Sequence, residues 1–189
     1  MIRTIIAALF SLLSLLPALA ASPVDTAARK AAGAPALKAV FTLNGAPGSL
    51  LMCGKMFAVD LPEMKIHFDG TTQWTHSVPD AEITIVTPTD AEIAQINPLA
   101  FLGSLRGEFN VSDLSGGNVR LLPKDTSSGI DEIVALFSNS TGWPVQIRMT
   151  SSGHTALIDQ ITVTTLDKPL PPSTFTVTPA KGVTVVDLR

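Results

Sequence analysis

The chain has 189 residues, 46% of them hydrophobic, and a formal net charge of −3 at pH 7. A chain of this length forms one domain, with room for at most a small second one. The acidic balance argues against a nucleic acid partner, because nucleic-acid-binding proteins present a basic stripe. It also argues against tight electrostatic binding to anionic lipid headgroups.

The first twenty residues have the pattern of a secretory signal peptide. Arg3 gives a short basic start, an apolar run follows, and Ala18-Leu19-Ala20 supplies the small-x-small ending of a cleavage site. The run is short for a membrane span. We therefore expect a signal peptide over 1–20, cleavage after Ala20, and a single exported domain over 21–189.

A short helix and then a series of strands are predicted in the first third of the chain. Residues 24–32 can form about two helical turns, which Gly33 and Pro35 would end. Asp69-Gly70 then lies between two alternating segments, a strong signal for a β-hairpin. The strands expected before this hairpin are 37–44, 49–53, 56–61 and 64–68, with a turn over 45–48 between the first two.

Apolar and polar residues alternate with a period of two in several of these segments. Met64, Ile66 and Phe68 point to one side of their strand, and the residues between them point to the other. Ile83 and Ile85 alternate in the same way within 81–87. This pattern predicts an antiparallel sheet that is apolar on one face only.

Residues 87–105 break the strand pattern and predict helix. Thr89 and Glu92 have the spacing of a capping box, in which each side chain bonds the other residue's backbone. We expect a helix from Thr89, a break at Asn97-Pro98 and a second short helix. Both would lie against an apolar surface, because their apolar residues are Ile93, Ile96, Leu99, Phe101, Leu102 and Leu105.

The remainder of the chain predicts further strands. About a dozen strand candidates with one helical insertion indicate a long meandering sheet that must curl or fold over on itself. It either closes into a filled sandwich or barrel, or stays partly open over a cavity. The later candidates are 107–113, 118–123, 130–139, 144–150, 155–165, 173–178 and 183–188.

No pattern of catalytic or metal-ligating residues is found in the sequence. His67, His76 and His154 are isolated from one another, and Cys53 is the only cysteine. The chain contains no nucleophile elbow, phosphate loop or paired metal-binding motif. We therefore expect neither enzyme activity nor a metal or other cofactor.

Three stretches resemble the LolA-type carriers of outer-membrane lipoproteins. "FDGTTQWTHSVPDAEITIVTP" (68–88) is similar to their Asp-Gly-x-x-x-Trp hairpin and the strand that follows it. "STFTVTPAKGVTVVDLR" (173–189) resembles their terminal pattern, and "TPTDAEIAQINPLAFL" (87–102) resembles the short lid segment of one branch. Together with the strand spacing of 41–70, the resemblance covers roughly 37–189.

The resemblance implies a large incomplete antiparallel β-barrel, or half-barrel, with a short helical lid over an apolar cavity. It implies a monomeric periplasmic carrier that shields the acyl chains of lipoproteins and transfers them toward the outer membrane. An inner-membrane lipoprotein-releasing ABC transporter would be the donor, and an outer-membrane protein the acceptor. The implied cavity residues are Met64, Ile66, Phe68, Trp74, Ile83 and Ile85, and the implied lid residues are Ile93, Ile96, Leu99, Phe101 and Leu102.

The sequence departs from that family in two places. Its N-terminal helix is expected to span only about eight residues, whereas the family has several turns. The family has an arginine just after the second strand that helps to latch the lid, whereas this neighbourhood reads "MCGKMFAV" (52–59), with Lys55 and no arginine. Lysine lacks the planar fork of donors that arginine provides. Two alternatives therefore stay open: a lipid- or lipoprotein-sensing module with this fold, and a packed β-domain without a cavity.

Overall fold

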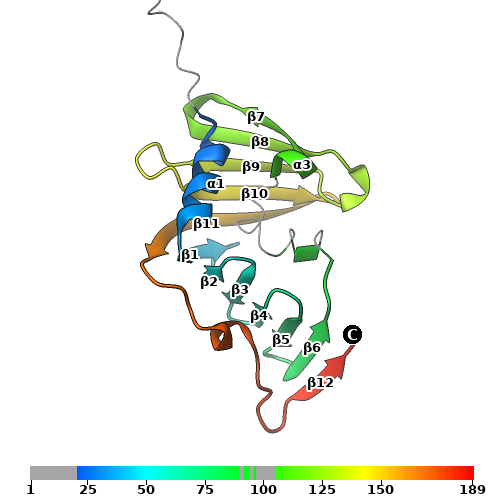
Figure 1. Cartoon of the computed structure of the whole chain (residues 1–189). Coiled ribbons are helices and arrows are strands. Elements are labelled where there is room, and N and C mark those ends of the chain that lie inside the picture. The colour runs from blue at the N-terminus through cyan, green and yellow to red at the C-terminus, as the bar shows by residue number, and fades with distance from the viewer. Residues whose placement is uncertain (1–20, 90–91, 94–95, 97–104) are drawn as a thin grey trace, which may run out of the picture.

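A single open β-sheet dominates the chain. The computed structural model describes residues 21–89, 92–93, 96 and 105–189. Within them, a 12-stranded sheet has the order β12-β6-β5-β4-β3-β2-β1-β11-β10-β9-β8-β7. Figure 1 shows this sheet curving around its interior without closing, so that β7 and β12 remain its edges. The predicted mainly-β, incomplete barrel is confirmed.

The strands follow the chain closely, since most neighbours in the sheet are also neighbours in sequence. They are β1 (Ala36–Leu43), β2 (Ala46–Cys53), β3 (Met56–Asp60), β4 (Met64–Phe68), β5 (Gln73–Ser77), β6 (Glu82–Val86), β7 (Phe109–Asp113), β8 (Asn118–Pro123), β9 (Glu132–Phe137), β10 (Pro144–Ser151), β11 (His154–Leu166) and β12 (Thr184–Asp187). The described helices are α1 (Pro23–Gly33), α3 (Leu105–Glu108), and the 3-10 helices η2 (Ser115–Gly117), η3 (Thr126–Ser128) and η4 (Pro172–Phe175).

The predicted strand over 173–178 is wrong, because the chain there forms η4 and then an irregular segment. Two prolines precede or begin this helix, and proline cannot donate a hydrogen bond to a strand ladder. The chain returns to the sheet only at β12, which pairs with β6. That pairing is parallel, whereas a wholly antiparallel sheet was expected.

The helix α1 is longer than predicted, with 11 residues. It begins at Pro23, which suits the first helical turn because its fixed φ is already helical and its missing N–H is not needed there. The helix ends at Gly33, as the sequence predicted. The predicted strand over 107–113 is also shortened, because α3 occupies its first residues.

The turn between β1 and β2 differs from the prediction. Asn44 and Gly45 both have positive φ, at 49° and 87°, which is the requirement of a two-residue hairpin turn that Asn-Gly meets well. The predicted turn over 45–48 is therefore wrong, and β2 begins at Ala46. Gly48 lies inside β2, where a Cβ atom would stand 2.5 Å from the Phe41 ring.

The predicted β4–β5 hairpin is confirmed. The Asp69 carboxylate accepts hydrogen bonds from the backbone N–H groups of Thr71 at 2.9 Å and Thr72 at 2.8 Å. The Asp69 N–H donates to the Thr72 carbonyl at 3.2 Å. Gly70 has a φ of 100°, which a residue with a Cβ rarely adopts. The aspartate side chain therefore organises the turn.

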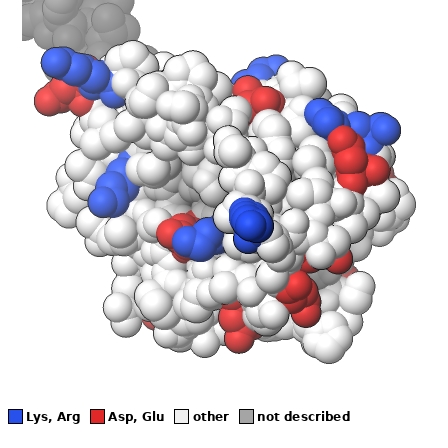
Figure 2. Space-filling view, turned by 90° about the horizontal axis from the view of Figure 1, so that it is seen from below, with Lys and Arg blue, Asp and Glu red and all other residues white. Residues whose placement is uncertain are grey.

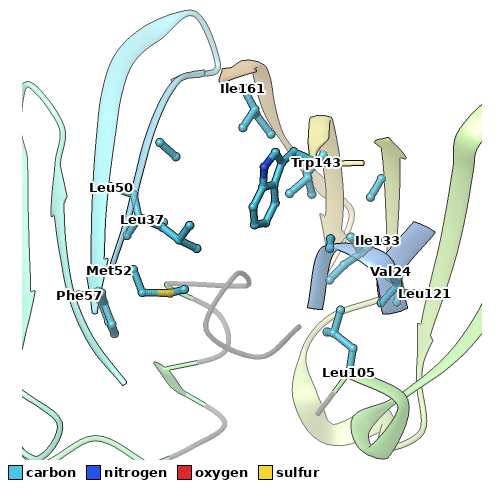
Figure 3. Close-up of a cluster of buried hydrophobic side chains, with 14 of the residues drawn as sticks. Val24, Leu37, Leu50, Met52, Phe57, Leu105, Leu121, Ile133, Trp143 and Ile161 are labelled. Atoms are coloured by element: carbon cyan, nitrogen blue, oxygen red, sulfur yellow. The ribbon is translucent and has the colours of Figure 1, made fainter. Parts of the chain in front are cut away.

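One face of the sheet, which we call the inner face, carries the main core. α1 lies across the strands β8 to β11 on this face (Figure 1), where Val24 and Ala27 are fully or almost fully buried. Side chains from β1–β3 and from β8–β11 point toward one another across the interior (Figure 3). The core therefore lies inside the curve of the sheet, between the sheet and its helical cover.

A second group of buried side chains lies outside this core. Ile83 and Ile85 are 2% and 8% exposed and Phe175 is 0% exposed, yet none of the three belongs to the inner-face cluster. The helix η4 packs against β3, which places Phe175 over the opposite, outer face. The C-terminal segment therefore covers part of the outer face before it reaches β12.

The burial of Phe175 predicts a large loss of stability on truncation. Phe175→Ala should lower the free energy of unfolding by about 3–5 kcal/mol, because it removes a buried ring and leaves a cavity. Urea unfolding followed by circular dichroism measures this loss. The exposed neighbour Thr176 gives the control variant Thr176→Ala, and equal stability of the two variants would contradict the packing described.

Candidate functional site

The inner face of β3 and β4 is the apolar wall on which the candidate site is built. Ile66 and Phe68 are 5% and 4% exposed, and Met64 is half-buried against the same cluster. The rings of Phe68 and Phe57 have centroids 5.3 Å apart and are tilted by 40°. These side chains share a face because they alternate along β4, as the sequence predicted.

The other three predicted wall residues lie on the outer face. Residues directly paired across two strands point to the same side of a sheet. His67 pairs with Trp74, and Trp74 pairs with Ile85, so Trp74 and Ile85 share the face of His67 and not that of Ile66. Ile83 follows through its pair with His76. The predicted set therefore forms two surfaces and not one wall.

The start of the predicted lid has the expected capping box. The Thr89 N–H and hydroxyl both donate to the Glu92 carboxylate at 2.8 Å, and the Glu92 N–H donates to the Thr89 hydroxyl at 3.3 Å. These bonds lower the pKa of Glu92. Ile93, 6% exposed, and Ile96 pack into the inner-face cluster. The other predicted lid residues lie outside the described residues: Leu99, Phe101 and Leu102.

Polar contacts fix the N-terminal cover to its half of the sheet. At the start of α1, the Ser22 hydroxyl donates to Asp113 of β7 at 2.8 Å. The Arg106 guanidinium of α3 donates to both carboxylate oxygens of Asp25, at 3.0 and 2.9 Å, and lowers the pKa of Asp25. This fork joins α1 to the segment that follows the predicted lid, whereas Lys55 is exposed in the β2–β3 turn.

The end of α1 is held by the loop before β10. Lys30 Nζ donates to the Thr141 carbonyl and lies 5.9 Å from the centre of the Trp143 ring. Trp143 is 7% exposed and points into the inner-face cluster (Figure 3). Sequence analysis did not single out Trp143 because it precedes a strand and therefore takes no part in an alternating pattern.

An open pocket of about 610 Å³ lies at the hairpin end of the first six strands. Leu43, Leu61, Met64, Thr75 and Ser77 are among the residues that line it. Its volume falls within the range of small-molecule sites. Figure 2, viewed from below, shows a surface on which charged side chains are few and scattered. The inner face thus continues into a hollow whose apolar lining comes from β1, β4 and the β3–β4 turn.

His67 is a titratable side chain on the outer face whose surroundings lower its pKa. It lies half-buried on the outer face between Ala58 and Trp74. Burial lowers its pKa, the Asp60 charge opposes that shift, and Lys65 and His76 add to it. Over the same described part of the chain, no three His, Cys, Asp or Glu side chains are grouped to hold a metal ion.

No helix within residues 21–89, 92–93, 96 and 105–189 is long and apolar enough to cross a membrane.

Comparisons with known proteins identify similar folds. No family model and no curated protein sequence matches the chain. An uncharacterized conserved protein from Thermus thermophilus has a TM-score of 0.56 at 10% identity, over 87% of this chain and 96% of that one. A DUF1329 family protein from Desulfovibrio piger has a TM-score of 0.47 at 11% identity, over 82% of this chain and 95% of that one.

A third solved structure is similar to this chain. A LolA superfamily protein from Nitrosomonas europaea has a TM-score of 0.41 at 12% identity, over 82% of this chain and 96% of that one. The solved structures similar to this chain thus include that of a LolA superfamily protein. Likeness at this level of identity concerns the fold alone.

The lowered pKa of His67 predicts a pH dependence of stability. Between the folded pKa and the ordinary value near 6.5, the unfolded chain binds a proton that the folded chain does not. The free energy of unfolding therefore has its full contribution from neutral His67 above pH of about 6.5, and it loses this contribution as the pH falls toward the folded pKa. Urea unfolding of the wild type and of His67→Gln at a series of pH values measures it.

The variant should lose this part of the pH dependence, because glutamine does not titrate. His154→Gln, at the exposed first residue of β11, is the matched control and should retain this part of the pH dependence. Identical profiles for His67→Gln and the wild type would contradict the assignment.

Proposed function

We propose that this chain is a periplasmic carrier that shields the acyl chains of lipoproteins and moves them toward the outer membrane. The observation that carries the proposal is the open sheet, whose apolar inner face is covered, among the described residues, by α1 and by Ile93 and Ile96 and not by a second sheet. Segments of this kind can move away from a sheet without breaking its strand pairs. The resemblance of 68–88 and 173–189 to LolA-type carriers supports the same reading.

Two described parts of the chain cover the inner face. α1 is fixed over β8–β11 by Ser22, Asp25 and Lys30, which contact three different parts of the chain. The second cover includes Ile93 and Ile96, and it begins at a capping box whose hydrogen bonds are internal to the segment. We propose that this second cover is the lid, and that acyl chains replace Ile93 and Ile96 on the inner face.

The free energy of burial sets a limit on such a carrier. Three acyl chains contain on the order of 45 methylenes, and at about 0.8 kcal/mol each their full transfer from water releases about 36 kcal/mol. Non-covalent affinities saturate near about 18 to 21 kcal/mol. The carrier therefore shields its cargo only in part. We propose that an energised inner-membrane ABC transporter loads it, and that an outer-membrane acceptor with better burial unloads it.

The proposal predicts that a charge on the lid prevents cargo binding. Ile93→Glu should reduce the co-purification of acylated lipoproteins from periplasm several-fold, because a carboxylate on the inner face must be desolvated when the chains are bound. Val40→Glu places the same charge at an exposed position, 44% accessible, on the opposite face. It should leave co-purification unchanged. Immunoblotting of the co-purified lipoproteins measures both.

Three results would contradict the proposal. Equal binding of delipidated lipoprotein would show that acyl chains are not what is recognised. Failure of bis-ANS to bind the folded chain would favour a packed β-domain without an accessible cavity. Binding of lipid or lipoprotein without transfer to membranes that contain the acceptor would favour the alternative of a sensing module.

A further inference from the structure

A polar stripe runs along the inner face beside the apolar wall. Gln73, Thr75 and Ser77 alternate along β5, with Trp74 and His76 between them on the outer face. Their partners on β4 are the three inner-face wall residues, since Phe68 pairs with Gln73, Ile66 with Thr75, and Met64 with Ser77. Each of these apolar residues of β4 therefore lies beside a residue of β5 whose side chain can form hydrogen bonds.

One member of this stripe is buried with an unused acceptor. Gln73 is 7% exposed. Its side-chain Nε2 donates to the Thr75 hydroxyl at 3.0 Å, and its Oε1 is buried without a hydrogen-bond partner. Buried amide oxygens in folded proteins are nearly always hydrogen-bonded, so an unpaired one calls for an explanation. A bound ligand that carries a donor would supply one.

The stripe leads from Gln73 to the open pocket. Thr75, which holds the Gln73 amide, lines that pocket together with Ser77 and the apolar Leu43, Leu61 and Met64. The charged residues that line the pocket are Glu63 and Asp80, both acidic. Two carboxylates disfavour an anionic ligand by like-charge repulsion. A neutral donor beside a hydrocarbon chain fits both the acidic lining and the unpaired acceptor.

We propose that Gln73 Oε1 accepts a hydrogen bond from the neutral N–H or O–H group that adjoins the acyl chain of a bound amphiphile. The chain would lie on Met64, Ile66 and Phe68, and the donor would lie along β5. This inference rests on the proposed function and adds a polar criterion to it: the site distinguishes acyl groups that carry a donor from those that do not.

Three probes built on a twelve-carbon chain test the inference. N-methyldodecanamide supplies an N–H, dodecanol supplies an O–H, and methyl dodecanoate supplies neither. Displacement of bis-ANS by each probe gives the dissociation constants for the wild type and for Gln73→Leu. The preference for a donor probe is the ratio of the dissociation constant of the ester to that of the probe. The test compares this ratio between the wild type and Gln73→Leu.

Loss of one neutral hydrogen bond should reduce the preference for the amide or the alcohol about three- to tenfold in Gln73→Leu. A loss confined to one of these two probes would identify the donor. Gln146→Leu is the matched control, since Gln146 lies on the outer face of β10 and donates to Asp159. It should keep the wild-type preference. Gln73→Met serves as a second variant if leucine disturbs the fold.

An unchanged preference in both Gln73 variants, with all three probes still bound, would overturn this inference and leave the carrier proposal standing. Failure of every probe to bind the wild type would overturn the carrier proposal, and this inference with it.

Discussion

The sheet has one apolar face that must be buried, and no second sheet packs on it within the described residues. The rest of the structure depends on how this face is covered. Twelve strands in an open order leave the inner face, from Phe57 on β3 to Leu121 on β8, in need of burial. The sheet curves so that its two halves share this interior, and α1 packs into it together with Ile93 and Ile96. The proposed carrier function requires that part of this cover moves away while the strand pairs stay intact.

The two faces of the sheet bury different sets of residues. The inner face holds the main core and opens into the pocket beside Met64. The outer face near β3 to β6 has its own buried residues, among them Ile83 and Phe175. The C-terminal segment is therefore a fixed part of the fold, since it covers the outer face and then lengthens the sheet with β12.

The strands and helices could be predicted from the sequence better than the register between strands, which decides which side chains share a face. Period-two alternation identified most strands, and the capping box at Thr89 predicted the contacts found there. Alternation assigns faces within one strand, but the register between strands decides which faces coincide, and this is why Ile83 and Ile85 were expected beside Ile66. Trp143 and Gln73 were missed for a related reason. Their importance comes from burial and from partners distant in sequence or across the sheet.

The central claim is that acyl chains contact the inner face, and site-specific photocrosslinking tests it directly. A photoreactive phenylalanine analogue at Met64, on the inner face, should crosslink to acylated lipoprotein in periplasm. The same analogue at His76, on the outer face of the neighbouring strand, should not. Crosslinking from Met64 to the acylated form alone is the result this account predicts. Equal crosslinking from both positions, or equal crosslinking to lipoprotein without acyl chains, would contradict it.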